Sequence, residues 1–211
     1  EQYREYLDEA WQAEFDAWRG EYKTPWKDLR DDDLRVRNWD DDRRDRDQLA
    51  DGVVGEVIFP NTVPPFYPGF VLFAGPPKDE DYPRRRAGIH AHNRWLADFC
   101  ASRPHRRAGI GQIFLNDIDH AIEDATWCKE NGLRGGVLIP TVAPDVKWVK
   151  PLYDPEYDRL LQPIDDRRVG FYAALVPNRG DNDPKSRFEA HAEALEKDLG
   201  LKGTVMEDGA Y

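Results

Sequence analysis

The residues that most suggest chemistry in this sequence are two histidines one residue apart, His90 and His92. On a β-strand such a pair places both imidazoles on one face, which is a common way to begin a zinc site. The surrounding pattern is helical, however, and side chains two residues apart on a helix point about 200° apart around its axis. We therefore expect surface or packing roles for both rings, and the other three histidines stand alone in the sequence.

Residues suited to nucleophilic catalysis are scarce. The chain has only two serines, Ser102 and Ser186, and no Gly-x-Ser-x-Gly motif, which argues against a serine hydrolase. Its two cysteines, Cys100 and Cys128, fall on apolar faces of predicted helices and form neither a disulfide framework nor a CxxC metal pair. We expect both thiols to have packing roles.

Two glycine pairs and one acidic run could indicate a phosphate-binding loop and a metal site, but the surrounding sequence does not favour either. Gly109-x-Gly111 and Gly135-Gly136 form no phosphate-binding loop and fit close-packed positions in strands. The run Asp40–Asp42 could hold a metal ion, but acidic residues are also typical of the positive end of a helix, and a helix follows here. We favour the helix-terminus interpretation.

Four residues just beyond predicted strands are the best candidates for substrate binding. Asn61 and Thr62 follow the first strand, and Pro140 and Thr141 stand at the end of the third. In parallel α/β folds, ligands are handled at the carboxyl ends of the strands. These four residues are candidates because of their place in the predicted topology.

The elements that would position these residues alternate along the chain. Short β-branched segments at 53–60, 107–115 and 133–140 predict buried strands, and helical patterns at 86–102 and 117–130 separate them. Strands alternating with helices predict parallel βα units with helices packed on the sheet. The fold class is therefore α/β.

Further elements flank this middle region. Residues 1–20 form an amphipathic helix with an aromatic stripe, and residues 40–50 a short charged helix. The proline-rich and aromatic segment 61–84 is a loop long enough to line or cover a pocket. A further strand at 167–177 and a helix at 186–199 are expected after the last βα unit.

Composition limits the classes of partner. The chain has 211 residues with 30 Lys+Arg and 41 Asp+Glu, giving a formal net charge of −11, and 40% of it is hydrophobic. The acidic balance argues against binding to nucleic acid or to an anionic membrane surface. No apolar run is long enough to span a bilayer and no signal peptide is seen, so we expect a soluble, cytoplasmic protein.

Four stretches in the same order resemble one family, namely Asp51–Thr62, Ala91–Cys100, Gly132–Pro140 and Pro151–Pro155. Together they resemble the amidohydrolase-related family of metal-dependent hydrolases and decarboxylases, in the branch similar to aminocarboxymuconate-semialdehyde decarboxylase, over about residues 1–163. The resemblance implies a TIM-like (β/α)₈ barrel with a divalent metal, usually zinc, at its carboxyl mouth. It also implies hydrolysis or non-oxidative decarboxylation of a small-molecule substrate.

The sequence departs from the family at the metal ligands. The family's His-x-His pair ends a strand that would precede Glu1, and its further ligands, a histidine and an aspartate, have no visible counterpart after Pro155. His90 and His92 match a helix of the family instead. We therefore expect a partial barrel that does not bind the metal alone, with the missing strands coming from another chain or from a homo-oligomer.

Two domains follow from the extent of the resemblance. Residues 1–163 are the partial barrel segment, and residues 164–211 are a divergent strand–helix segment of uncertain origin, whose tail at 203–211 is faintly similar to the catalytic domain of ring-hydroxylating Rieske oxygenases. The expected function is that of a metal-dependent hydrolase or non-oxidative decarboxylase. The alternatives are a non-catalytic α/β interaction or scaffold module and an oxygenase-related fragment.

Overall fold

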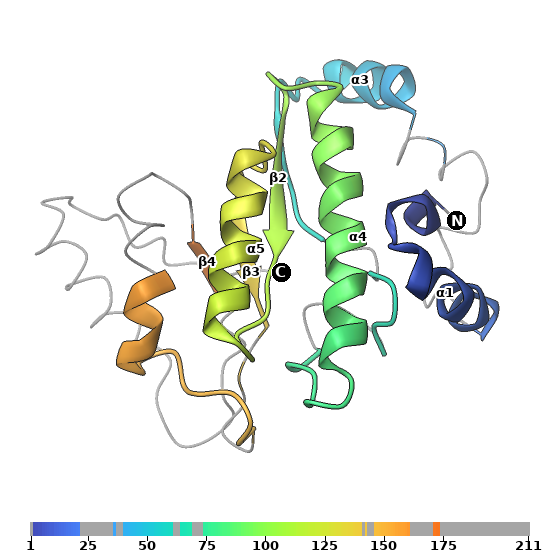
Figure 1. Cartoon of the computed structure of the whole chain (residues 1–211). Helices are drawn as coiled ribbons and strands as arrows, with labels where there is room; N and C mark the ends of the chain where they lie inside the picture. The colour runs from blue at the N-terminus through green and yellow to red at the C-terminus, as the bar shows by residue number, and fades with distance from the viewer. Residues whose placement is uncertain are drawn as a thin grey trace, which may run out of the picture. The chain divides into compact units, whose positions relative to one another are not determined.

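The structure is a computed structural model that divides the chain into two compact units, Glu1–Ala174 and Leu175–Tyr211. The described residues all lie in the first unit and are 2–21, 36, 40–60, 64–68, 74–140, 142, 146–160 and 171–173 (Figure 1). The predicted helix at 186–199 and the tail similar to Rieske oxygenases lie outside them. The domain boundary expected near residue 163 stays a prediction.

The centre of the first unit is a parallel sheet of four strands, β1 (Glu56–Ile58), β2 (Arg107–Gln112), β3 (Gly136–Ile139) and β4 (Phe171–Ala173). Each observed strand lies within a predicted one, so the α/β class with parallel strands is confirmed. The spatial order β1-β2-β3-β4 repeats the chain order, whereas a doubly wound fold reverses it at a switch point. The four described strands form an open sheet, and no closed barrel is seen among them.

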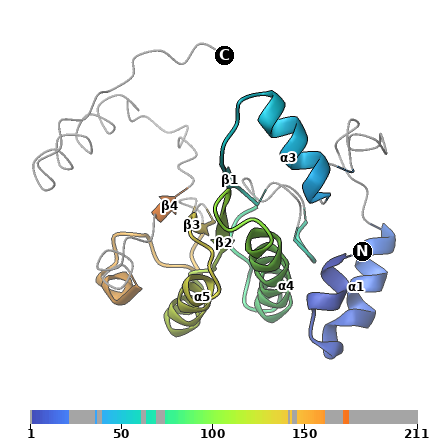
Figure 2. The same ribbon diagram turned by 90° about the horizontal axis from the view of Figure 1, so that it is seen from above.

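Two long helices connect these strands and pack on one face of the sheet, α4 (Tyr82–Ala101) and α5 (Ile118–Glu130) (Figure 2). Helix α4 begins four residues earlier than the pattern predicted, because Pro83 is tolerated in a first helical turn. Helix α5 is capped by Asp117, whose side chain accepts a hydrogen bond of 2.9 Å from the backbone N–H of His120. Among the described residues, no helix is long and apolar enough to cross a membrane.

The prediction of one continuous N-terminal helix was wrong. A 3₁₀ helix η1 (Gln2–Tyr6) precedes α1 (Glu9–Glu21), and the chain turns between them. The turn buries Leu7, which is 5% exposed, and lets Asp8 pair with Arg94 of α4. The aromatic stripe is retained, since the rings of α1 pack against the buried ring of Phe66.

Close packing of α4 and α5 on the sheet depends on strand glycines. A Cβ on Gly109 would lie 2.8 Å from Sγ of Cys100, and a Cβ on Gly111 would clash with Sγ of Cys128. The interpretation of these glycines as packing positions is confirmed. Both thiols are buried, and burial raises the pKa of Cys128 to about 12, which fits the packing roles expected for them.

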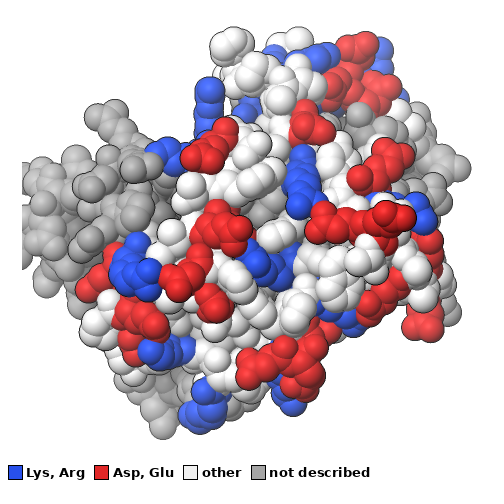
Figure 3. All heavy atoms as spheres, viewed as in Figure 1, with Lys and Arg blue, Asp and Glu red and all other residues white. Residues whose placement is uncertain are grey.

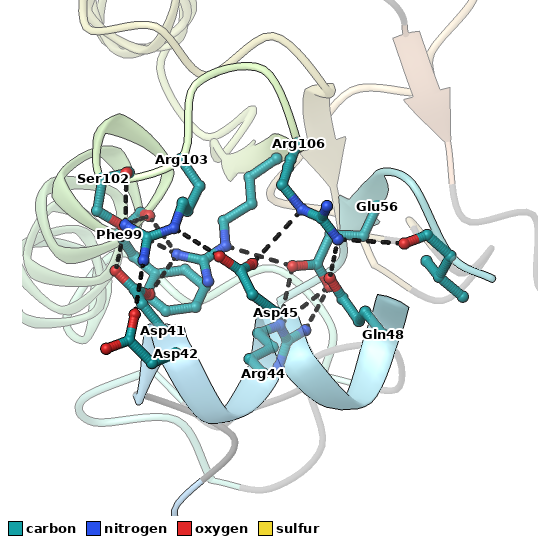
Figure 4. A network of polar contacts seen from close by, with 12 residues as sticks. Asp41, Asp42, Arg44, Asp45, Gln48, Glu56, Phe99, Ser102, Arg103 and Arg106 are labelled. Atoms are coloured by element: carbon teal, nitrogen blue, oxygen red, sulfur yellow. Dashed lines mark hydrogen bonds and ion pairs between the residues drawn. The ribbon is translucent and has the colours of Figure 1, made fainter. Parts of the chain in front are cut away.

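Helix α3 (Asp41–Ala50) confirms the interpretation of the acidic run, because Asp40 caps it by accepting a hydrogen bond of 2.7 Å from the N–H of Arg43. The helix is held at the amino ends of β1 and β2 by an ion-pair network that we call the amino-edge network (Figure 4). Its members are Asp41, Asp42, Arg44, Asp45, Glu56, Arg103, Arg106 and Arg107.

The centre of the amino-edge network is the buried guanidinium of Arg107, whose side chain is 1% exposed. It lies 2.6 Å from Asp41 and 3.3 Å from Glu56, and it stacks 3.8 Å from the ring centroid of Phe99. A charge buried this deeply is tolerated when it is paired on several sides. In a βα sheet, polar networks at the amino ends of the strands stabilise the fold, so we assign this one a structural role.

The outer face of α4 and α5 carries side chains of both charges. Acidic and basic residues are interspersed over it, without a broad region of one sign (Figure 3). One ion pair on this face joins the two helices, Arg86 with Asp124 at 2.7 Å. This face therefore fits a solvated surface held by local ion pairs.

Candidate functional site

The carboxyl ends of the strands meet at one edge of the sheet, where ligands are expected in parallel α/β folds. Of the four residues predicted to bind substrate, only Pro140 is described. It follows β3 directly and is partly buried. Asn61, Thr62 and Thr141 lie outside the described residues, so the substrate-binding role of all four stays a prediction.

The best-defined group of polar side chains at this edge is centred on Gln112, the last residue of β2. The amide of Asn93, on α4, donates a hydrogen bond of 2.9 Å to the backbone oxygen of Gln112 and accepts one of 2.9 Å from its backbone N–H. Both residues are buried, at 2% exposed each. This double hydrogen bond fixes the end of β2 against the helix.

The side chain of Gln112 is only half satisfied. Its Oε1 accepts a hydrogen bond of 3.2 Å from the hydroxyl of Tyr67, which is itself buried. Its Nε2 has no hydrogen-bond partner among the described residues. A buried amide donor without a partner costs free energy, so its persistence calls for an explanation.

Arg85, in the first turns of α4, lies against the same tyrosine. Its guanidinium carbon is 4.0 Å from the ring centroid of Tyr67 and 5.4 Å from that of Phe114. The side chain is buried, at 4% exposed, and it donates a long hydrogen bond of 3.5 Å to the backbone oxygen of Gly75 and also interacts with the hydroxyl of Tyr67. Within the described part of the chain, its Nε has no partner. We call Tyr67, Arg85, Asn93, Gln112 and Phe114 the carboxyl-edge cluster.

Burial sets the protonation state of the tyrosine hydroxyl in the cluster. Loss of solvent raises the pKa of Tyr67 to about 12, although the charge of Arg85 opposes the rise. The hydroxyl therefore stays protonated at neutral pH and donates to Gln112. The amide of Gln112 is in turn oriented with its Nε2 donors away from the tyrosine oxygen.

A second tyrosine stands beside the cluster. Tyr82 packs edge-on against Phe114, with ring centroids 6.2 Å apart, and its hydroxyl lies 3.1 Å from Nδ1 of His120 at the start of α5. Burial raises the pKa of Tyr82 to about 12 as well. The pair adds a protonated phenol and a half-exposed imidazole to the carboxyl edge of the sheet.

His90 and His92 do not converge, as their helical spacing predicted. Nε2 of His90 lies 2.8 Å from the carboxylate of Asp124, between α4 and α5. The ring of His92 is buried between the rings of Tyr3 and Trp95, and burial lowers its pKa to about 4.

The zinc site implied by the family resemblance has no counterpart among the described residues. No three His, Cys, Asp or Glu side chains there come close enough to hold a metal ion. The carboxylate of Asp124 is already bound by His90 and Arg86, whose hydrogen bonds outweigh the effect of burial and lower its pKa. No chemical step on a metal can be assigned to these residues.

Sequence reasoning missed the carboxyl-edge cluster, although part of the signal was present. Gln112 is a polar residue that interrupts the apolar run 108–115 of a predicted strand. Arg85 lies four residues before Ile89 and eight before Asn93, and so it shares their buried helix face. Tyr67 belongs to the aromatic loop predicted to line or cover a pocket, but the sequence did not single it out among the aromatic residues of that loop.

This chain is similar to some solved structures but not to any known protein family. No protein-family model and no curated protein matches the sequence. Among solved structures, the chain is similar to 2,6-dihydroxybenzoate decarboxylase from Rhizobium, with a TM-score of 0.44 and 23% sequence identity. A 2,6-dihydroxybenzoate decarboxylase complexed with 2,6-dihydroxybenzoate matches with the same values. In both cases 74% of this chain covers 44% of the other, so the chain spans less than half of either protein.

Proposed function

We propose that this chain is part of an amidohydrolase-related (β/α)₈ enzyme that catalyses metal-dependent hydrolysis or non-oxidative decarboxylation of a small molecule. The observation that supports this most is the parallel sheet whose strands lie in chain order with both connecting helices on one face, which is the winding of a βα barrel. The resemblance of four sequence stretches to that family agrees with it. The substrate would be held at the carboxyl edge, where the cluster around Gln112 lies.

The proposed enzyme needs more than the described residues provide. Four strands do not close an eight-stranded barrel, and the outer edge of β1 has no described neighbour. A divalent metal, zinc in this family, is proposed on the basis of the sequence resemblance alone. Its ligands and the missing strands would come from residues outside the described ranges, from a second copy of this chain or from another chain.

A non-catalytic interaction module is the second candidate, favoured by the surface around β1. Apolar side chains are exposed along this edge strand and the turn before it, with Val54 79%, Val57 50% and Phe59 42% exposed. Exposed apolar edge strands are sites where another chain can add a strand. The same surface fits either missing barrel strands or a binding partner of a scaffold.

A combined measurement of metal content and turnover tests the proposal. The purified chain is dialysed, analysed for metal and sized by light scattering. It is then assayed for release of CO₂ from aromatic carboxylic acids and for hydrolysis of amides, with and without added Zn²⁺. Turnover that a chelator abolishes is the expected result. An assembled protein that neither retains metal nor turns over any substrate would favour the interaction module.

A matched pair of tyrosine variants ties turnover to the carboxyl edge. Tyr67→Phe removes the hydroxyl that orients Gln112, and we expect it to lower kcat/KM by about tenfold, the usual value of one lost hydrogen bond in a site. Tyr153→Phe makes the same chemical change at a side chain that is 88% exposed and should leave turnover unchanged. Equal effects of the two variants would remove the carboxyl edge from the proposed site.

A further inference from the structure

Helix α3 lies at the amino ends of β1 and β2 without contributing to the core. None of its ten residues is buried, and none belongs to the hydrophobic clusters of the described residues. Its one large aliphatic side chain, Leu49, is 59% exposed. Burial of an apolar face is the usual reason why a helix stays on a protein, so α3 is held in another way.

One set of contacts joins aspartates of α3 to two partly exposed arginines (Figure 4). Asp45 lies 2.7 Å from Nε of Arg103 and 3.4 Å from Nε of Arg106. Asp42 lies 3.1 Å from Arg103. The arginine side chains are 31% and 21% exposed. Ion pairs that solvent reaches contribute little to stability one by one, and they weaken as salt screens the charges.

The other set of contacts involves a buried pair that persists without α3. Asp41 of α3 lies 2.6 Å from Arg107, and Arg44 of α3 lies 2.8 Å from Glu56. Arg107 and Glu56 also lie 3.3 Å from each other. Each of these two buried charges therefore keeps an oppositely charged partner when α3 departs, and the departure leaves neither of them isolated.

The surface that α3 covers is basic. Outside α3, the members of the amino-edge network are three arginines and one glutamate, Arg103, Arg106, Arg107 and Glu56. Guanidinium groups bind carboxylates through paired, charge-assisted hydrogen bonds. The surface therefore fits a segment that carries acidic side chains, and α3 is the example of such a segment in this chain.

We propose that α3 is a detachable strap over this arginine surface, and that the uncovered surface binds an acidic segment of another protein. Asp41 and Asp45 stand one turn apart on α3, so a partner helix with the same spacing can make the same pairs. A ten-residue helix is shorter than the roughly 12–15 residues that an isolated helix needs in water, so α3 unfolds once it is released. Nucleic acid is a poorer match, because the whole chain has a formal net charge of −11.

Hydrogen exchange of the full chain, followed by mass spectrometry, tests whether α3 detaches. We expect the amides of α3 to exchange about tenfold faster when NaCl is raised from about 0.05 to 0.5 M, because salt screens several partly exposed pairs at once. Helix α5 packs into the hydrophobic core and is the internal control, whose exchange should not change. Equal changes in the two helices, or no change in α3, would overturn the strap.

Two aspartates of α3 provide a matched pair of variants. Asp45→Asn removes the charge that faces Arg103 and Arg106, and it should speed exchange of α3 at low salt by about tenfold. Asp47→Asn makes the same chemical change at a side chain that pairs within the helix, with Arg43 at 2.9 Å, and should have a much smaller effect. Equal effects would mean that helix propensity, and not docking on the arginines, controls the exchange. Exchange of α5 in the same samples shows that each variant is folded.

A labelled peptide with the sequence of residues 40–51 tests the partner by fluorescence anisotropy. It should bind the Asp45→Asn protein at least about tenfold more tightly than the wild type, in which α3 occupies the arginines with the advantage of an intramolecular segment. The same peptide with D41N and D45N should bind at least about tenfold more weakly.

Three results of the peptide experiment would overturn the proposed partner. They are no binding to either protein, equal binding of the two peptides, and tighter binding of a single-stranded oligonucleotide, which would assign the surface to nucleic acid. None of these readouts needs turnover, so the inference stands or falls separately from the proposed enzyme activity.

Discussion

The buried imidazole of His92 makes the stability of this protein depend on acidity. Burial lowers its pKa from 6.5 to about 4, so the folded protein keeps the ring neutral at pH values where the unfolded chain protonates it. Stability is then complete above pH 6.5 and is lost as the pH falls toward 4. Linkage between these two pKa values gives a loss of about 2 kcal/mol on going from pH 7.5 to pH 5.

Urea unfolding of the wild type and of His92→Gln at a series of pH values between 7.5 and 5 measures this loss. Glutamine does not titrate, so the free energy of unfolding of the variant should vary with pH by about 2 kcal/mol less than that of the wild type. Replacement of the half-exposed His120 by glutamine is the control and should leave the wild-type dependence in place. A difference between wild type and His92→Gln that stays constant over this range would refute the reasoning.

Three other predictions follow from packing and charge. Asp124→Asn removes the buried carboxylate that binds Arg86 and should lower the free energy of unfolding by about 3–5 kcal/mol, measured by urea unfolding at neutral pH. A loss under about 1 kcal/mol would contradict the pairing. Gly111→Ala drives a methyl group into Cys128 and should cost about 1–3 kcal/mol by the same assay, whereas Gly20→Ala, with open space around it, should cost nothing measurable. The thiol of Cys128, buried and with a pKa of about 12, should react with iodoacetamide at pH 8 only after unfolding, and mass spectrometry would reveal any modification of the folded protein.

The strands were predictable because their signals are local. The segment 53–60 is β-branched and ends in a proline, and the observed strand β1 lies inside it. It is shorter than predicted, since pairing with β2 extends only over Glu56–Ile58. The length of a strand depends on what its neighbour can bond, which a single segment does not encode.

The prediction of helix boundaries failed where a residue type is compatible with two kinds of local structure. Pro83 suggested a loop, yet proline fits the first turn of a helix and α4 begins at Tyr82. The aromatic spacing of residues 1–20 continues through the turn at Leu7, so periodicity alone could not reveal the break.

The position of the candidate site could be predicted from the sequence, but the residues that form it could not. Topology directed attention to the carboxyl edge, where Gln112 ends β2, and the role of that edge in binding substrate stays a prediction. The predicted residues were chosen for their nearness to strand ends, whereas Arg85 and Tyr67 reach the edge from a helix and a loop. Which of three successive arginines turns inward depends on the phase of α4 against the sheet, and that phase is fixed by tertiary packing.

The agreement between spatial and chain order in the sheet has a consequence for how the protein is made. Among the four described strands, each pairs with the one synthesised just before it, so β2 can dock on β1 before β3 has left the ribosome. When the sheet grows in this direction, the edge that awaits the next strand always lies on the most recently synthesised strand. We therefore expect a nascent chain stalled after α5 to be compact but prone to associate through the unpaired edge of β2. A chaperone would be needed most at this stage of synthesis.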